Sequence, residues 1–153
     1  FDTSLKVFDL TAGFCKDACS IANMGFQVTA YEKESWLFEF NKTCLSSLKK
    51  RNLNLINLNS IRALKKVTKK DILFLDPMFE INSRASAKKE IQFLRKCIST
   101  SSEKEILDAA QKSSAGVIII KRHKLSNSQN PTKPSYVIKG KVISFEVFDR
   151  RAV

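Results

Sequence analysis

The chain has 153 residues, of which 43% are hydrophobic and 27% carry a charge. Its 27 Lys and Arg outnumber 15 Asp and Glu, which gives a formal net charge of +12 at pH 7. The apolar content excludes a generally disordered chain, and the positive surplus favours a polyanionic partner such as nucleic acid. The longest apolar run, 116–120, is far shorter than the ~20 residues of a spanning helix, so we expect no membrane association.

Strand and helix patterns alternate from the start of the chain. Strands are predicted at 5–8, 26–31, 53–58, 72–75 and 117–120, and helices at 16–24, 35–48 and 91–98 and from Ser102 onward. The polar, proline-containing stretch 121–134 is predicted to be a loop, and 136–138 with 142–148 a closing hairpin. These patterns predict one α/β domain over 1–153, with a mostly parallel sheet, helices on both faces and a C-terminal antiparallel hairpin.

Cysteine and histidine spacing gives no metal site. The four cysteines, Cys15, Cys19, Cys44 and Cys97, and the single histidine, His123, do not form the close ligand pairs of structural zinc. We therefore expect no metal, and we expect reduced cysteines in a cytoplasmic protein.

Polar residues come directly after the predicted strands. In a parallel sheet the carboxyl ends of the strands share one edge, and ligands bind there, where the strand order reverses. The residues that this rule places at the site are Asp9, Glu32, Asn59, Ser60, Asp76, Lys121 and Arg122.

The turn after the first predicted strand contains a single glycine, Gly13. A dinucleotide-binding turn has three glycines, and Cys15 and Ala18 stand at its second and third positions, so a pyrophosphate ligand is disfavoured. Glu32 can accept hydrogen bonds from both hydroxyls of a ribose, although alone it also fits a solvated surface acid. Together Asp9, Gly13 and Glu32 favour a nucleoside ligand without phosphates, for which S-adenosyl-L-methionine is the obvious candidate.

The tetrapeptide Asp76-Pro77-Met78-Phe79 directly follows an apolar strand. Proline fixes the backbone and removes a donor, so the Asp76 carboxylate and nearby carbonyls can accept hydrogen bonds from an exocyclic amine. Phe79 can stack on the face of a base. An amine that attacks a sulfonium methyl group needs such acceptors for its protons. The alternative interpretation is an ordinary strand-to-turn transition with Phe79 in the core.

Basic residues gather at the predicted mouth of the site, where we expect them to contact phosphates. They are Arg84, Lys88, Lys89, Lys121, Arg122 and Lys124. Another basic stretch, 40–70, contains nine Lys and Arg and no acid, and this pattern is usual for a solvated face.

Several of these segments together carry a resemblance: 9–18, 32–33, 75–79, 88–90 and 121–122. Their order and spacing resemble those of class I S-adenosylmethionine-dependent methyltransferases. More narrowly, the chain is similar to the bacterial small-subunit rRNA guanine-N2 methyltransferases of the RsmJ (YhiQ) type over nearly its whole length. The family has a segment before its first strand, which we expect this chain to lack, and Cys15 and Lys16 stand where the family has glycine and arginine.

The resemblance implies a Rossmann-like class I methyltransferase sheet, S-adenosyl-L-methionine as cofactor, and methylation of a guanine N2 amine in rRNA or the small ribosomal subunit. The cofactor residues that it implies are Asp9, Gly13, Lys16, Asp17, Glu32, Lys33, Asn59, Ser60 and Asp76. The implied catalytic residues are Asp76, Pro77 and Phe79, with Phe79 as the base platform.

Three other functions remain open at this point. A DNA amino-methyltransferase also uses Asp-Pro-x-aromatic motifs. A non-catalytic RNA-binding domain would keep the fold and the positive charge without binding the cofactor. An oxidoreductase with a nicotinamide cofactor is disfavoured by the missing glycines.

Overall fold

The computed structural model describes residues 4–47, 51–77, 101–124 and 132–151. Two predictions fall outside these residues: the helix at 91–98, and the site residues Phe79, Arg84, Lys88 and Lys89. Within the described part of the chain, no helix has the length and apolar character needed to cross a membrane.

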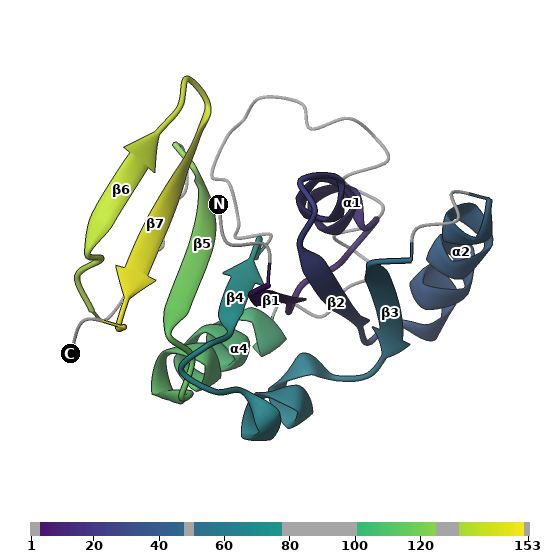
Figure 1. The fold of residues 1–153 in the computed structure, drawn as a ribbon, viewed down its shortest axis with the longest axis horizontal. Coiled ribbons are helices and arrows are strands. Elements are labelled where there is room, and N and C mark those ends of the chain that lie inside the picture. Colours follow the sequence, from purple (N-terminus) through teal and green to yellow (C-terminus); the bar gives the residue numbers. More distant parts are fainter. Residues whose placement is uncertain (1–3, 48–50, 78–100, 125–131, 152–153) are drawn as a thin grey trace.

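The described strands form one seven-stranded sheet in the order β3-β2-β1-β4-β5-β7-β6 (Figure 1). The strands are β1 (Lys6–Asp9), β2 (Gln27–Glu32), β3 (Leu53–Asn57), β4 (Ile72–Leu75), β5 (Val117–His123), β6 (Tyr136–Lys139) and β7 (Ile143–Asp149). Strands β1 to β5 pair in parallel, whereas β7 is antiparallel to both β5 and β6. The predicted mostly parallel sheet with a closing antiparallel hairpin is confirmed.

Helices cover both faces of the sheet. Successive side chains of a strand point to opposite faces, so each strand contributes to two cores. On one face, Phe74 of β4 packs in a cluster with Ala18 and Ala22 of helix α1 (Lys16–Asn23). On the other face, Leu73 packs with residues of helix α4 (Ser101–Lys112). The helices that complete the layers are α2 (Ser35–Ser46) and the 3₁₀ helix η1 (Ser60–Lys66).

The sequence-based prediction of a loop from Lys121 is wrong at its start. Strand β5 continues to His123, because each of its residues pairs with β7, from Val117 opposite Asp149 to His123 opposite Ile143. A polar run such as Lys121-Arg122-His123 looks like a loop when it is read locally, but its pairing partner lies about 20 residues further along the chain.

Helix η1 was not predicted. It begins after Asn59, whose side-chain Oδ1 accepts a hydrogen bond from the Ile61 N–H at 3.1 Å. Short 3₁₀ segments have no distinctive apolar period, so the Asn cap was the only local signal.

Candidate functional site

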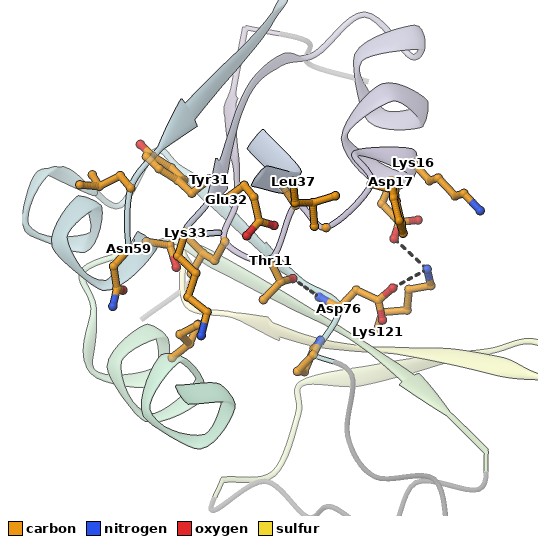
Figure 2. A pocket seen from close by; sticks show the side chains of 18 residues that line it. Thr11, Lys16, Asp17, Tyr31, Glu32, Lys33, Leu37, Asn59, Asp76 and Lys121 are labelled. Carbon is orange, nitrogen blue, oxygen red and sulfur yellow. Dashed lines mark hydrogen bonds and ion pairs between the residues drawn. The ribbon is translucent and has the colours of Figure 1, made fainter. Parts of the chain in front are cut away.

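A cleft of about 260 Å³ opens at the carboxyl ends of β1, β2 and β4 (Figure 2). It lies where the strand order reverses, since β2 pairs with one side of β1 and β4 with the other. The sequence-predicted residues that line this cleft are Gly13, Lys16, Asp17, Glu32, Lys33, Asn59, Ser60, Asp76, Pro77 and Lys121. The fold thus brings together residues from both halves of the sheet.

The turn between β1 and α1 forms the floor of the cleft. Gly13 has φ +49°, a left-handed conformation that glycine adopts readily. The buried Asn41 side chain of α2 donates from Nδ2 to the Gly13 carbonyl at 2.6 Å, which holds the turn from the side of the neighbouring helix. Cys15 is also left-handed, with φ 57°, and is only 1% exposed. This conformation costs a non-glycine residue roughly 1–2 kcal/mol. A glycine at position 15 would avoid that cost.

Asp9 lies beneath the turn rather than in the cleft. It is 1% exposed, and its Oδ1 accepts a hydrogen bond from the Thr11 N–H at 3.1 Å. Burial raises the pKa of Asp9 to about 7; the Thr11 N–H opposes the rise, and the nearby acids add to it. The sequence had placed Asp9 at the site, but in the structure it does not line the cleft and instead supports the turn.

Glu32 ends β2 at the rim of the same turn. Its Oε1 accepts a hydrogen bond from the Glu34 N–H at 2.8 Å. Burial raises the pKa of the Glu32 carboxyl, and hydrogen bonds from backbone N–H groups at Glu34 and Gly13 oppose the rise. The side chain points into the cleft (Figure 2), where its carboxylate is placed to accept hydroxyl protons.

Asp76 follows β4 and is held through both its backbone and its side chain. Its N–H donates to Thr11 Oγ1 at 2.7 Å. Its Oδ2 accepts from Lys121 Nζ at 2.8 Å, and the same ammonium group donates to Asp17 Oδ2 at 2.8 Å. Burial raises the pKa of Asp76, and the Lys121 ammonium opposes the rise. Burial lowers the pKa of Lys121, but hydrogen bonds to Asp17 and Asp76 outweigh it, so the pKa lies above its usual value.

The remaining wall of the cleft is apolar, and the sequence reasoning did not identify it. It includes Leu10, Tyr31, Leu37, Leu58 and Ile106, which come from five different parts of the chain. An apolar wall suits the ring of a base, and the three acids Asp17, Glu32 and Asp76 suit hydroxyl groups and positive charge. The cleft therefore offers surfaces for a nucleoside, and its lining holds Lys16, Lys33 and Lys121 as well as the three acids.

Lys121 and Arg122 were both expected to contact phosphates, but they face opposite sides of β5, as neighbours in a strand do. Lys121 lines the cleft, whereas Arg122 is 5% exposed and its Nε donates to Glu146 Oε2 at 3.1 Å. The structure does not bring Arg122 to the site. Within the described residues, no three His, Cys, Asp or Glu side chains are grouped as metal ligands would be.

A family model and several named proteins match the sequence of this chain. The family model described as "Putative SAM-dependent methyltransferase" matches residues 2–150. Proteins named ribosomal RNA small subunit methyltransferase J are 29% identical over 93% of the chain in Coxiella burnetii, and 30% identical over 94% in Buchnera aphidicola. The chain covers 59% and 62% of those proteins, so it spans about three fifths of their length.

A solved structure shows the same fold. The crystal structure of a SAM-dependent methyltransferase from Neisseria gonorrhoeae superimposes with a TM-score of 0.68 at 24% identity, and the match covers 97% of this chain and 62% of that one. The family model matches nearly the whole chain, and the chain shares its fold with this solved structure. This chain belongs to the SAM-dependent methyltransferase family.

Proposed function

We propose that the chain binds S-adenosyl-L-methionine in the cleft and transfers its methyl group to the N2 amine of a guanine in small-subunit rRNA. The observation that carries this proposal is that Glu32, after β2, and Asp76, after β4, line one cleft around the Gly13 turn. The family match and the names of the relatives support the reaction and the rRNA substrate. We regard 1–153 as one methyltransferase domain, because every described strand belongs to one sheet.

The chemistry of the lining residues fits this cofactor. Glu32 would accept the ribose hydroxyls, and the apolar wall near Leu58 and Ile106 would contact the adenine. Lys16 and Asp17 carry the opposite charges that the carboxylate and ammonium of the methionine part require. Lys33, Asn59 and Ser60 complete the cofactor residues that we propose. When bound, the cofactor supplies an electrophilic methyl group on a sulfonium.

Asp76 is placed to act on the acceptor amine. In the proposed reaction the bound cofactor would supply the methyl group to the amine, and Asp76 would accept the proton that the amine gives up. The Asp76 carboxylate would accept that amine's hydrogen bonds and aim its lone pair, so catalysis is mainly positioning. Pro77 follows Asp76 and also lines the cleft. Phe79 stays our proposed platform for the unstacked base.

The positive charge of the chain supports an RNA partner. A net charge of +12 attracts the phosphate backbone over a long range. Arg84, Lys88 and Lys89 remain our proposed phosphate contacts. An rRNA substrate would place the protein with ribosomes in the cytoplasm.

Transfer of labelled methyl groups from S-adenosylmethionine tests the proposal. The full-length protein is incubated with small ribosomal subunits that lack the modification, with free rRNA, and with duplex DNA. We expect label in small-subunit rRNA, recovered as N2-methylguanine, and a loss of at least about 100-fold in rate with Asp76→Asn. Label in duplex DNA alone would instead identify a DNA amino-methyltransferase. Salt-sensitive RNA binding by a folded protein that transfers no label would identify a non-catalytic RNA-binding domain.

A further inference from the structure

The ammonium group of Lys121 lies between two carboxylates from different elements. Its Nζ is 2.8 Å from Asp17 Oδ2 and 2.8 Å from Asp76 Oδ2 (Figure 2). Asp17 belongs to the first turn of α1, next to the Gly13 turn, whereas Asp76 follows β4. The Lys121 side chain is 19% exposed, so this contact is partly shielded from water.

Strand pairing on both sides fixes the position from which the Lys121 side chain extends. The preceding residue, Ile120, pairs with Leu75 of β4, and Lys121 itself pairs with Phe145 of β7. Asp76 comes directly after Leu75, so the paired strands bring the ammonium and this carboxylate to the same end of the sheet. The Asp76 N–H is held by Thr11 Oγ1 at 2.7 Å. The Lys121 and Asp76 side chains that make the contact therefore extend from well-anchored parts of the backbone.

Lys121 opposes the effects that raise the pKa of Asp76. Asp17 raises the pKa of Asp76 through its negative charge and through a hydrogen bond, in addition to the larger effect of burial. Lys121 lowers the pKa of Asp76 through a hydrogen bond and through its charge. Two acids in a partly buried cleft disfavour each other's ionised form, and one ammonium that contacts both offsets this repulsion.

We propose that Lys121 is a positioning residue that keeps Asp76 ionised and ties it to Asp17 across the cleft. Its role would then be internal to the site rather than a contact to RNA phosphate. The inference rests on the proposed function in one respect: an ionised Asp76 can accept the hydrogen bonds of an acceptor amine, whereas a protonated one would present a donor. Through Asp17, the same ammonium connects the part of the cleft that we propose for the cofactor with the part that we propose for the acceptor amine.

Other charged groups face the same cleft and are common to all variants of Lys121. They are Lys16, Asp17, Glu32, Lys33 and Asp76, with Asp9 buried below. A difference between the wild type and a Lys121 variant therefore isolates the effect of this ammonium on the remaining groups.

The test uses the full-length protein with Lys121→Met, Lys121→Arg and, as a matched loss of one charge, Lys139→Met on the exposed strand β6. Titration of the Asp76 carboxyl carbon by NMR needs no catalytic activity. We expect the Asp76 titration to move to higher pH by about one unit in Lys121→Met, to stay near the wild-type value in Lys121→Arg, and to be unchanged in Lys139→Met. An unmoved titration in a folded Lys121→Met protein would overturn the proposal.

Kinetics provide the second readout. We expect Lys121→Met to move the acidic limb of the pH–rate profile to higher pH by about the same one unit, so that kcat falls by up to about tenfold at pH values below that limb, with recovery in Lys121→Arg. A higher KM for RNA at unchanged kcat and unchanged pH profile would show a phosphate contact instead. If Lys121→Met does not fold, Lys121→Gln decides: it also removes the ammonium charge, so the Asp76 titration must move to higher pH, and a shift downward or no shift overturns the proposal. If the wild type transfers no methyl group while the NMR shifts follow expectation, only the proposed function fails.

Discussion

Thr11 Oγ1 accepts a hydrogen bond from the backbone N–H of Asp76 at 2.7 Å, although 65 residues separate the two in the chain. The Thr11 N–H in turn donates to Asp9 Oδ1 at 3.1 Å. One side chain thus joins the end of β1 to the end of β4, the two strands between which the sheet order reverses. The backbone of the proposed amine-binding acid is fixed by the same turn that contains Gly13.

Replacement of Thr11 by valine tests this connection. The change keeps the branched shape and removes the acceptor, so the partly buried Asp76 N–H loses its partner. We expect Thr11→Val to lower the free energy of unfolding by about 1–2 kcal/mol, measured by urea denaturation. Thr11→Ser keeps the hydroxyl and serves as the control. Equal stability of the valine and serine variants would contradict the importance of this hydrogen bond.

The buried Asp9 predicts an unusual dependence of stability on pH. Its pKa is about 7 in the folded protein, against an ordinary value of 3.8. Between these values the folded state keeps a proton that the unfolded chain has lost, so stability falls as the pH rises through this interval and levels off above it. The loss reaches roughly 4 kcal/mol at most, since each pKa unit corresponds to about 1.4 kcal/mol.

Asp9→Asn removes this titration, while the amide oxygen can still accept the Thr11 N–H. We expect the variant to gain stability relative to the wild type between about pH 4 and pH 7 and to keep that gain at higher pH. Urea denaturation at a series of pH values measures the difference in the free energy of unfolding between the two proteins. Glu32 and Asp76 are present in both proteins, so their own titrations cancel in this difference. Parallel stability curves for the two proteins would show that Asp9 ionises normally.

The cysteines should differ widely in reactivity. Burial raises the pKa of the Cys15 thiol to about 12, whereas Cys44 is exposed and Cys19 is half-buried. Since the thiolate is the reactive form, we expect iodoacetamide at about pH 8 to label Cys44 first, Cys19 more slowly and Cys15 only after unfolding. Mass spectrometry of proteolytic peptides measures the order. Labelling of Cys15 as fast as Cys44 in the folded protein would contradict its placement in the turn.

Much of the site could be predicted because it depends on local patterns and a general rule of topology. Glu32 and Asp76 each end an apolar strand, and parallel strands joined by helices place such ends at one edge. The single glycine at position 13 marks the turn that supports them, and its φ of +49° shows why glycine suits that position. The same reasoning placed Asn59 and Ser60, which are the cap and the first residue of η1 after the end of β3.

The features of the fold and the site that could not be predicted depend on contacts that no local sequence pattern reveals. The antiparallel pairing with β7 extends β5 through Lys121 and Arg122, and strand alternation then directs one into the cleft and the other to Glu146. The bridge from Thr11 to Asp76 joins residues that are distant in sequence. The apolar wall includes Ile106 of α4, whose spacing identifies only a buried helix face.

Calorimetric titration of the full-length protein with S-adenosyl-L-methionine tests most directly whether Glu32 and Asp76 frame a cofactor cleft. We expect saturable binding by the wild type and affinity weakened about 10- to 100-fold in Glu32→Gln, because a hydrogen bond to a charged carboxylate contributes about 1.5–3 kcal/mol. Glu39→Gln, on the exposed face of α2, should bind as the wild type does. No binding by the folded wild type, or equal affinity in Glu32→Gln, would contradict the account.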